Sequence, residues 1–170
     1  MICGLDLSLR STGVALISEQ EPMTWTITSK PPQTVIEVAQ LIVKQVLSIA
    51  QRDKEVTFFI EDYSFGKFGT SSSVTALIEL TGIITYELHK NNLTYFKIPP
   101  TILKKYLTGK GNAKKEQMLV FALEKYGIHF NSSDECDAFA LADLGLAFLT
   151  GKNLKGKNLD KKILDFMQKL

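Results

Sequence analysis

Residues 2–7 read Ile-Cys-Gly-Leu-Asp-Leu, a short apolar run interrupted by one carboxylate. A run of this length, bounded by turn-forming residues, predicts a buried β-strand. Residues 13–17 and 23–27 carry apolar or alternating patterns and predict two further strands. The connections between the three strands are short enough for hairpins, so we expect antiparallel pairing.

The rest of the chain mixes helical and strand patterns. Thr34 and Glu37 form a capping-box signature ahead of an amphipathic helix, and residues 56–60 are apolar on both faces, as in a central strand. The later elements are expected at 74–89 (helix), 93–98 (strand), 101–107, 113–126 and 134–149 (helices, the last capped by Ser132 or Ser133) and 160–170 (tail helix). The order β-β-β-α-β-α-β-α-α-α through residue 149 predicts an α/β fold. We expect a five-stranded mixed sheet with helices on both faces and the 56–60 strand beside the first.

Length and composition indicate one domain with a real core. The chain has 170 residues, of which 45% are hydrophobic and 22% charged. We assign residues 1–150 to the main body and 151–170 to a basic linker and helix of the same domain.

No apolar run approaches the roughly 20 residues that cross a bilayer, so no membrane partner is expected. Cys3 and Cys136 lack disulfide or zinc spacing, which favours reduced thiols in a cytoplasmic protein.

Four carboxylates interrupt segments whose other residues favour burial. Asp6 and Glu61 lie on the first and fourth predicted strands, and Asp134 and Asp137 share a helix face at i,i+3 spacing. Buried charges are costly unless they are paired or bound to metal, and adjacent strands would place Asp6 and Glu61 roughly 5 Å apart. The set fits two Mg²⁺ ions about 3.5–4 Å apart, and we expect Mn²⁺ to substitute. Taken singly, Asp134 also fits a plain first-turn helix residue, and Glu61 a surface acid.

Five other polar residues are interpreted as lying outside this site. Asp62 and Glu135 are adjacent to the key acids but are expected to point elsewhere. Asp143 lies further along the last long helix and is expected on its polar face. His89 and His129 are isolated histidines without ligand spacing.

Positive charge is concentrated in two stretches. Residues 88–115 contain no Asp or Glu, and a second lysine cluster lies within 152–162. Such segregation indicates a polyanionic partner, although a solvated lysine-rich surface gives the same composition. The lysines that we expect to contact the phosphates of such a partner are Lys104, Lys105, Lys110, Lys114 and Lys115.

The loop after Glu61 is rich in glycine and serine and carries two aromatic residues. Residues 64–73 read SFGKFGTSSS. We expect Phe65 and Phe68 to stack on unpaired bases, with Lys67 contacting DNA beside them. The alternative is that both aromatic side chains fold back onto the core.

Four motifs follow one another along the chain. They are Gly4-Leu5-Asp6-Leu7-Ser8 with Thr12-Gly13, Ile60-Glu61-Asp62-Tyr63, residues 109–118 (GKGNAKKEQM) and residues 134–142 (DECDAFALA). Together they resemble the motifs of RuvC-type Holliday junction resolvases in the RNase H-like superfamily. The resemblance implies that Asp6, Glu61, Asp134 and Asp137 bind Mg²⁺, and that Lys115 contacts the backbone near the scissile phosphate.

The chain departs from cellular members of this family at several positions, the first of them in the opening motif. Leu7-Ser8 stands where those members usually have Pro-Gly. Its compact, lysine-rich form is more similar to phage-encoded members, which would act in the host cytoplasm. The resemblance names no helicase partner.

This resemblance, together with the four acids, implies a structure-selective endodeoxyribonuclease that nicks branched DNA, above all four-way junctions. Two symmetric cuts need two active sites, which a two-fold homodimer supplies. The apolar helix face expected at its interface consists of Val74, Leu77, Ile78 and Ile84.

Three alternatives differ in substrate or class. An RNase H-like nuclease would cut flaps or RNA–DNA hybrids with the same acids. A non-catalytic junction-binding protein would not need all four acids. The turn from Asp6 to Gly13 also resembles actin-like ATPases, but those need a second lobe, for which 170 residues leave no room.

Overall fold

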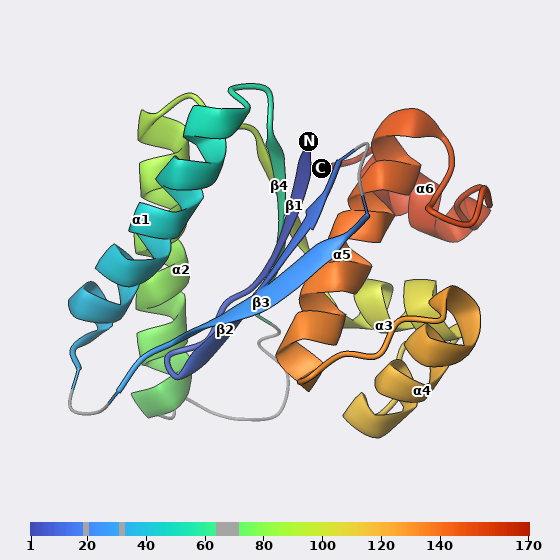
Figure 1. Cartoon of the computed structure of the whole chain (residues 1–170), viewed down its shortest axis with the longest axis horizontal. Coiled ribbons are helices and arrows are strands. Elements are labelled where there is room, and N and C mark those ends of the chain that lie inside the picture. The colour runs from blue at the N-terminus through green and yellow to red at the C-terminus, as the bar shows by residue number, and fades with distance from the viewer. Residues whose placement is uncertain (19–20, 31–32, 64–71) are drawn as a thin grey trace.

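The computed structural model describes residues 1–18, 21–30, 33–63 and 72–170, and is organised around one mixed β-sheet (Figure 1). The strands are β1 (Ile2–Asp6), β2 (Ser11–Ile17), β3 (Met23–Thr28), β4 (Thr57–Glu61) and β5 (Tyr95–Ile98). They lie in the spatial order β3-β2-β1-β4-β5. The pairs β1–β2 and β2–β3 are antiparallel, whereas β1–β4 and β4–β5 are parallel. The predicted five-stranded mixed sheet, with β4 beside β1, is confirmed.

Helices cover both faces of this sheet. They are α1 (Val35–Arg52), α2 (Ser72–Lys90), α3 (Pro100–Thr108), α4 (Lys115–Tyr126), α5 (Ser133–Thr150) and α6 (Lys161–Met167). One face carries α1 and α2, and α5 crosses the other with α3, α4 and α6 beside it (Figure 1). The predicted capping box is present, because Glu37 N donates to Thr34 Oγ1 at 3.2 Å and Thr34 N to Glu37 Oε2 at 2.7 Å. Within the described ranges, no helix is long and apolar enough to cross a membrane.

Each face of the sheet carries its own hydrophobic cluster. Alternation along β4 sends Phe59 into the cluster under α5, and Phe58 and Ile60 into the cluster under α1 and α2. The two cysteines, Cys3 and Cys136, are free thiols buried in opposite clusters. All of β1 is buried because it is the central strand. Burial on both faces fixes the register of β1 against β4, since a one-residue slip would exchange the faces of every side chain.

The backbone of α5 lies directly against two strands. A Cβ on Gly4 of β1 would stand 2.0 Å from the carbonyl oxygen of Ala138, and a Cβ on Gly13 of β2 would stand 2.0 Å from that of Asp134. Only glycine permits so close an approach. The two motif glycines therefore bring the first turns of α5 down onto the end of the sheet that carries Asp6.

The position predicted for Asp143, on a polar helix face, is wrong. Its side chain is buried, and its carboxylate accepts hydrogen bonds from the hydroxyls of Tyr106 in α3 and Tyr126 in α4, and from Leu154 N at 2.8 Å. Every residue of α5 from 135 to 145 is buried, so this part of the helix has no polar face. Through these hydrogen bonds Asp143 connects α5 to α3, to α4 and to the segment that follows α5.

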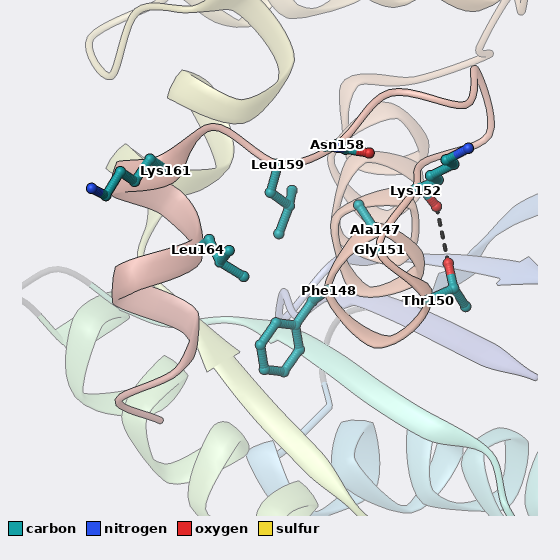
Figure 2. Close-up of a pocket in the computed structure, with 9 residues that line it drawn as sticks. All are labelled: Ala147, Phe148, Thr150, Gly151, Lys152, Asn158, Leu159, Lys161 and Leu164. Atoms are coloured by element: carbon teal, nitrogen blue, oxygen red, sulfur yellow. Dashed lines mark hydrogen bonds between the residues drawn. The ribbon is translucent and has the colours of Figure 1, made fainter.

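The C-terminal segment folds back along α5. Ile163 and Met167 of α6 belong to the cluster under α5 and are 2% and 1% exposed. Phe148, Leu159 and Leu164 line a pocket of about 490 Å³ between α5 and α6 (Figure 2). The packing of α6 thus extends the cluster that α5 forms with the sheet.

Candidate active site

Asp6 and Glu61 lie side by side at one end of the sheet. Leu5 is paired with Ile60 in the parallel β1–β4 ladder, so an acid follows on each strand. The two carboxyl groups share a hydrogen bond. Burial, reinforced by the charges of Glu61 and Asp137, raises the pKa of Asp6 well above its usual range. Burial also raises the pKa of Glu61, although its hydrogen bond with Asp6 opposes the rise.

The first turns of α5 add two carboxylates to this pair. Ser132 caps the helix, with its Oγ accepting from Glu135 N at 3.1 Å, and so fixes where Asp134 and Asp137 fall. Burial, followed by the charge of Glu61, raises the pKa of Asp137 to about 7. Electrostatic interactions connect all four predicted acids, so the structure brings them together in one cluster.

Two lysines offset part of this negative charge. Lys115, at the start of α4, places its Nζ 3.6 Å from Asp134 Oδ1. Burial lowers the pKa of Lys115, but the four carboxylates outweigh it and the net shift is upward. Burial raises the pKa of both Glu61 and Asp137, and the charge of Lys104 in α3 opposes both rises. Lys104, predicted only as a DNA contact, therefore lies within electrostatic reach of the acids.

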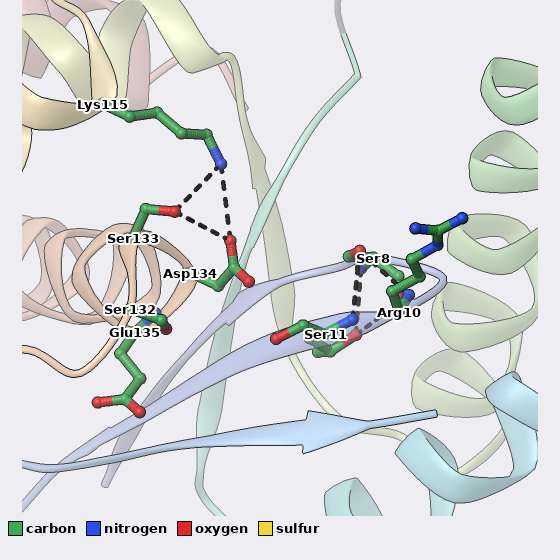
Figure 3. Close-up of polar contacts among 9 residues, drawn as sticks. Ser8, Arg10, Ser11, Lys115, Ser132, Ser133, Asp134 and Glu135 are labelled. Atoms are coloured by element: carbon green, nitrogen blue, oxygen red, sulfur yellow. Dashed lines mark hydrogen bonds and ion pairs between the residues drawn. The ribbon is translucent and has the colours of Figure 1, made fainter. Parts of the chain in front are cut away.

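Ser133 links Lys115 to Asp134, a role that sequence reasoning missed (Figure 3). Lys115 Nζ donates to Ser133 Oγ at 3.4 Å, and Ser133 Oγ donates to Asp134 Oδ1 at 3.3 Å. The neighbouring Ser132 is the helix cap, so the two hydroxyls do different things. The signal was a serine left over after the cap, directly before an acid.

The turn after Asp6 is closed by Thr12. This residue is fully buried, and its Oγ1 accepts from Ser8 N at 3.1 Å and donates to Ser8 O at 3.0 Å. The adjacent Gly13 admits the backbone of Asp134. The Thr12-Gly13 part of the first motif thus holds Asp6 and the start of α5 together.

The acids next to the cluster point elsewhere, as predicted. Glu135 is buried, and its Oε2 accepts a hydrogen bond from the hydroxyl of Thr24 in β3 at 3.1 Å. Asp62 Oδ1 accepts from Tyr63 N at 3.1 Å. Neither side chain is a source of the pKa shifts within the cluster.

The remaining predicted DNA contacts differ in their surroundings. Lys105 Nζ lies 3.6 Å from Asp160 Oδ1, whereas Lys110 and Lys114 are exposed. Lys104 and Lys105 diverge because consecutive helical residues project about 100° apart. The aromatic-loop residues Phe65, Lys67 and Phe68 lie outside the described residues.

The oxygen atoms of the cluster are of the type that binds a hard divalent cation. The cluster offers carboxylate oxygens, which Mg²⁺ prefers. Burial raises the pKa of Asp6 and Asp137, mutual repulsion adds to the rise, and a cation would reverse that trend. Among the described residues, no three His, Cys, Asp or Glu side chains are arranged to enclose one ion. The side chains thus fit such an ion by type and would have to turn toward it on binding.

Two acids stand at the ends of central parallel strands, and two more stand at the start of the helix that crosses these strands. This arrangement defines an RNase H-like nuclease. The order β3-β2-β1-β4-β5, with antiparallel pairing in its first three strands, agrees with that fold. The chain belongs to the crossover junction endodeoxyribonuclease RuvC family, whose model matches residues 2–144. The family inferred from the motifs is confirmed, and with it the assignment as an endonuclease.

Two curated relatives cover most of the chain. The crossover junction endodeoxyribonuclease RuvC of Orientia tsutsugamushi (strain Boryong) is 32% identical over 151 residues, which are 84% of this chain and 92% of the relative. That of Ehrlichia ruminantium (strain Gardel) is 29% identical over 154 residues, 83% of this chain and 92% of the relative.

Two solved structures share the fold. Thermus thermophilus RuvC superposes with a TM-score of 0.67 at 18% identity, over 88% of this chain and 96% of that chain. The same enzyme in complex with Holliday junction substrate gives a TM-score of 0.68 at 16% identity, over 93% and 98%.

Proposed function

We propose that this protein is a metal-dependent, structure-selective endodeoxyribonuclease that resolves four-way DNA junctions by paired symmetric nicks. The main support is the convergence of Asp6, Glu61, Asp134 and Asp137 from two strands and one helix. Membership of the RuvC family supports the reaction class. The T. thermophilus RuvC complex with Holliday junction substrate, which has the same fold, supports the choice of DNA.

The four carboxylates are proposed to hold two Mg²⁺ ions per site, with Mn²⁺ as a substitute. Bound cations would supply water activation and leaving-group stabilisation for phosphodiester hydrolysis. Asp6 is the central ligand in this proposal, because it interacts with the other three acids and is only 8% exposed. It lies on β1, the strand between β2 and β4.

Lys115 is proposed to bind the DNA backbone next to the scissile phosphate. Its side chain is 60% exposed, so the ammonium group is open to DNA. Asp134 and Ser133 fix its orientation from below. Lys104 adds positive charge beside the acids. Because these groups contact backbone rather than bases, they position DNA without reading its sequence.

We propose a two-fold homodimer that uses the outer face of α2. Ile84, expected at this interface, is 1% exposed and belongs to the core under the sheet, which corrects that expectation. Val74, Leu77 and Ile78 are partly exposed, and Tyr86 is 62% exposed. Sedimentation equilibrium should give a dimer that Tyr86→Glu weakens. A wild-type monomer at micromolar concentration would contradict this part of the proposal.

Residues 151–170 are proposed to belong to the same domain as residues 1–150. Their support is the burial of Ile163 and Met167 and the hydrogen bond from Leu154 N to Asp143. A chain truncated after residue 150 should unfold at a clearly lower temperature. Unchanged melting would make the segment a separate appendage.

Cleavage of a substrate panel in Mg²⁺ tests the proposed function. The panel contains a mobile and an immobile four-way junction, a flap and an RNA–DNA hybrid. We expect paired nicks at symmetric positions on the junctions, little cutting of the others, and no cutting after chelation. Asp165→Asn, a change at an exposed acid of α6, is the control for Asp6→Asn. Preference for the hybrid, or equal cutting by both variants, would overturn the assignment.

A further inference from the structure

A pocket of about 310 Å³ lies where α3, α4 and the segment between α5 and α6 meet. Each of these parts contributes one lysine, which are Lys105, Lys125 and Lys157. One acid, Asp160, also lines the pocket. None of these residues belongs to the carboxylate cluster. A hollow with three ammonium groups and one carboxylate favours an anionic ligand.

Lys125 is held in place over two aromatic rings. Its Nζ lies 4.8 Å from the ring centroids of both Tyr106 and Tyr126, within the range of cation–π attraction. Both tyrosine hydroxyls donate to the buried carboxylate of Asp143, which fixes the rings. The ammonium group of Lys125 is therefore positioned rather than freely solvated.

Lys157 is carried by a turn that Asn153 organises. Asn153 is 7% exposed, and its Oδ1 accepts from the backbone N–H groups of Lys155 and Lys157, both at 3.0 Å. Its own N–H donates to Lys157 O at 2.9 Å, and Gly156 supplies the positive φ of 69° that the turn needs. Asn158 and Leu159 then run beside α5 before the chain enters α6 (Figure 2).

The charges of this pocket are not balanced. Lys105 Nζ lies 3.6 Å from Asp160 Oδ1. The ion pairs found in the described part of the chain include neither Lys125 nor Lys157. Burial, together with repulsion from Lys157, lowers the pKa of Lys125 against the opposing charge of Asp143. An anion between two such ammonium groups would replace repulsion by attraction.

We propose that this pocket binds a phosphate group of the DNA backbone, on an arm of the same branched substrate that the carboxylate cluster cuts. The inference rests on the proposed function. DNA is favoured over a small free anion because Lys105 belongs to the basic stretch 88–115. In addition, Gly109, the cap residue that follows α3, lines the pocket and leads into the exposed Lys110. The pocket thus continues the surface expected to contact DNA.

The salt dependence of junction binding tests this assignment. Affinity is measured without divalent cations, so that no cutting occurs, for the wild type and the Lys125→Gln/Lys157→Gln variant. Lys157→Gln alone, at an exposed position, provides a variant whose folding is not at risk. The control is Lys44→Gln/Lys54→Gln, which makes the same charge change at exposed positions on the α1 side of the sheet. Inorganic phosphate is tested separately by its effect on the melting temperature.

We expect the slope of log K against log salt to become shallower by about one unit in the double variant, as for the loss of one phosphate contact. Lys157→Gln should give part of this change and the control none. An unchanged slope, or an equal change in the control, overturns the proposal. If the double variant loses only its stabilisation by inorganic phosphate and keeps the salt slope of the wild type, the pocket binds a free anion. That result also overturns the proposal. Failure of the wild type to bind junctions would instead refute the proposed function.

Discussion

Asp137 and Asp143 are buried carboxylates on the same helix, α5, yet their surroundings are opposite. Asp143 is surrounded by donors, because two tyrosine hydroxyls and one backbone N–H point at it. Asp137 is surrounded by other acids, and burial and the charge of Glu61 raise its pKa to about 7. The protein's own hydrogen-bond donors stabilise the carboxylate of Asp143. The repulsion around Asp137 is relieved only by protons or by cations.

This difference separates a structural acid from a functional one. A buried acid with its own donors stabilises the fold, and breaking it leaves those donors unpaired. A cluster of acids reduces stability in the absence of a ligand, which proteins tolerate at functional sites. Asp137 and Asp143 should therefore respond in opposite ways to substitution and to metal.

The largest expected effect is on catalysis at the cluster. Asp6→Asn should slow junction cleavage by at least about 100-fold, the scale for losing a group that stabilises developing charge. Junction binding should be kept or strengthened, because one negative charge facing DNA is removed. Gel-based cleavage and binding assays measure both quantities. Retained Mg²⁺-dependent nicking by the variant would show that Asp6 is not essential.

The next largest effect is on stability at Asp143. Asp143→Ala should lower the free energy of unfolding by about 3 kcal/mol, because the two tyrosine hydroxyls and Leu154 N lose a buried acceptor. Urea unfolding measures the change, with Asp165→Ala as the exposed control. A loss below about 1 kcal/mol would mean that these donors find other partners.

The pH dependence of stability should report the raised pKa of Asp137. The folded-state pKa of Asp137 is raised from 3.8 to about 7. Between these values the unfolded chain releases a proton that the folded chain keeps, so metal-free stability falls as pH rises through this window. Asp137→Asn should flatten the fall in melting temperature, and Mg²⁺ at pH 8 should restore the wild type. Parallel pH profiles of wild type and variant would contradict the raised pKa.

The smallest effect is expected from the two adjacent serines. Ser133→Ala should lower kcat several-fold with little change in KM or melting temperature, because it loosens Lys115 over Asp134. Ser132→Ala should instead cost about 1 kcal/mol of stability through loss of the helix cap. Ser133→Thr, which keeps the hydroxyl, should restore kcat. Equal effects of the two alanine variants on both readouts would remove the distinction.

Much of the fold followed from local patterns in the sequence. The apolar run that contains Asp6, and the two-sided run that ends at Glu61, predicted adjacent strands, and the β1–β4 register confirms them. The capping box at Thr34 could also be predicted from the sequence, because the two residues that form it lie within four positions. The i,i+3 spacing of Asp134 and Asp137 is local in the same way.

What the sequence did not reveal depends on contacts between distant segments. Asp143 was placed on a polar face because helix spacing says nothing of the helices that cover α5. Lys104 and Lys105 read as one basic patch, yet one reaches the acids and the other pairs with Asp160. Position 13 needs glycine because the backbone of Asp134, which is distant in the sequence, packs directly against it.

Binding of Mn²⁺ without DNA, followed by titration calorimetry and electron paramagnetic resonance, decides whether the four carboxylates form a metal site. We expect saturable binding of two ions per chain to the wild type. Asp6→Asn and Asp137→Asn should weaken this binding, and the folded Asp143→Asn variant should keep it. No saturable binding by the wild type, or binding that Asp6→Asn leaves unchanged, would contradict the assignment of the four carboxylates as a metal site.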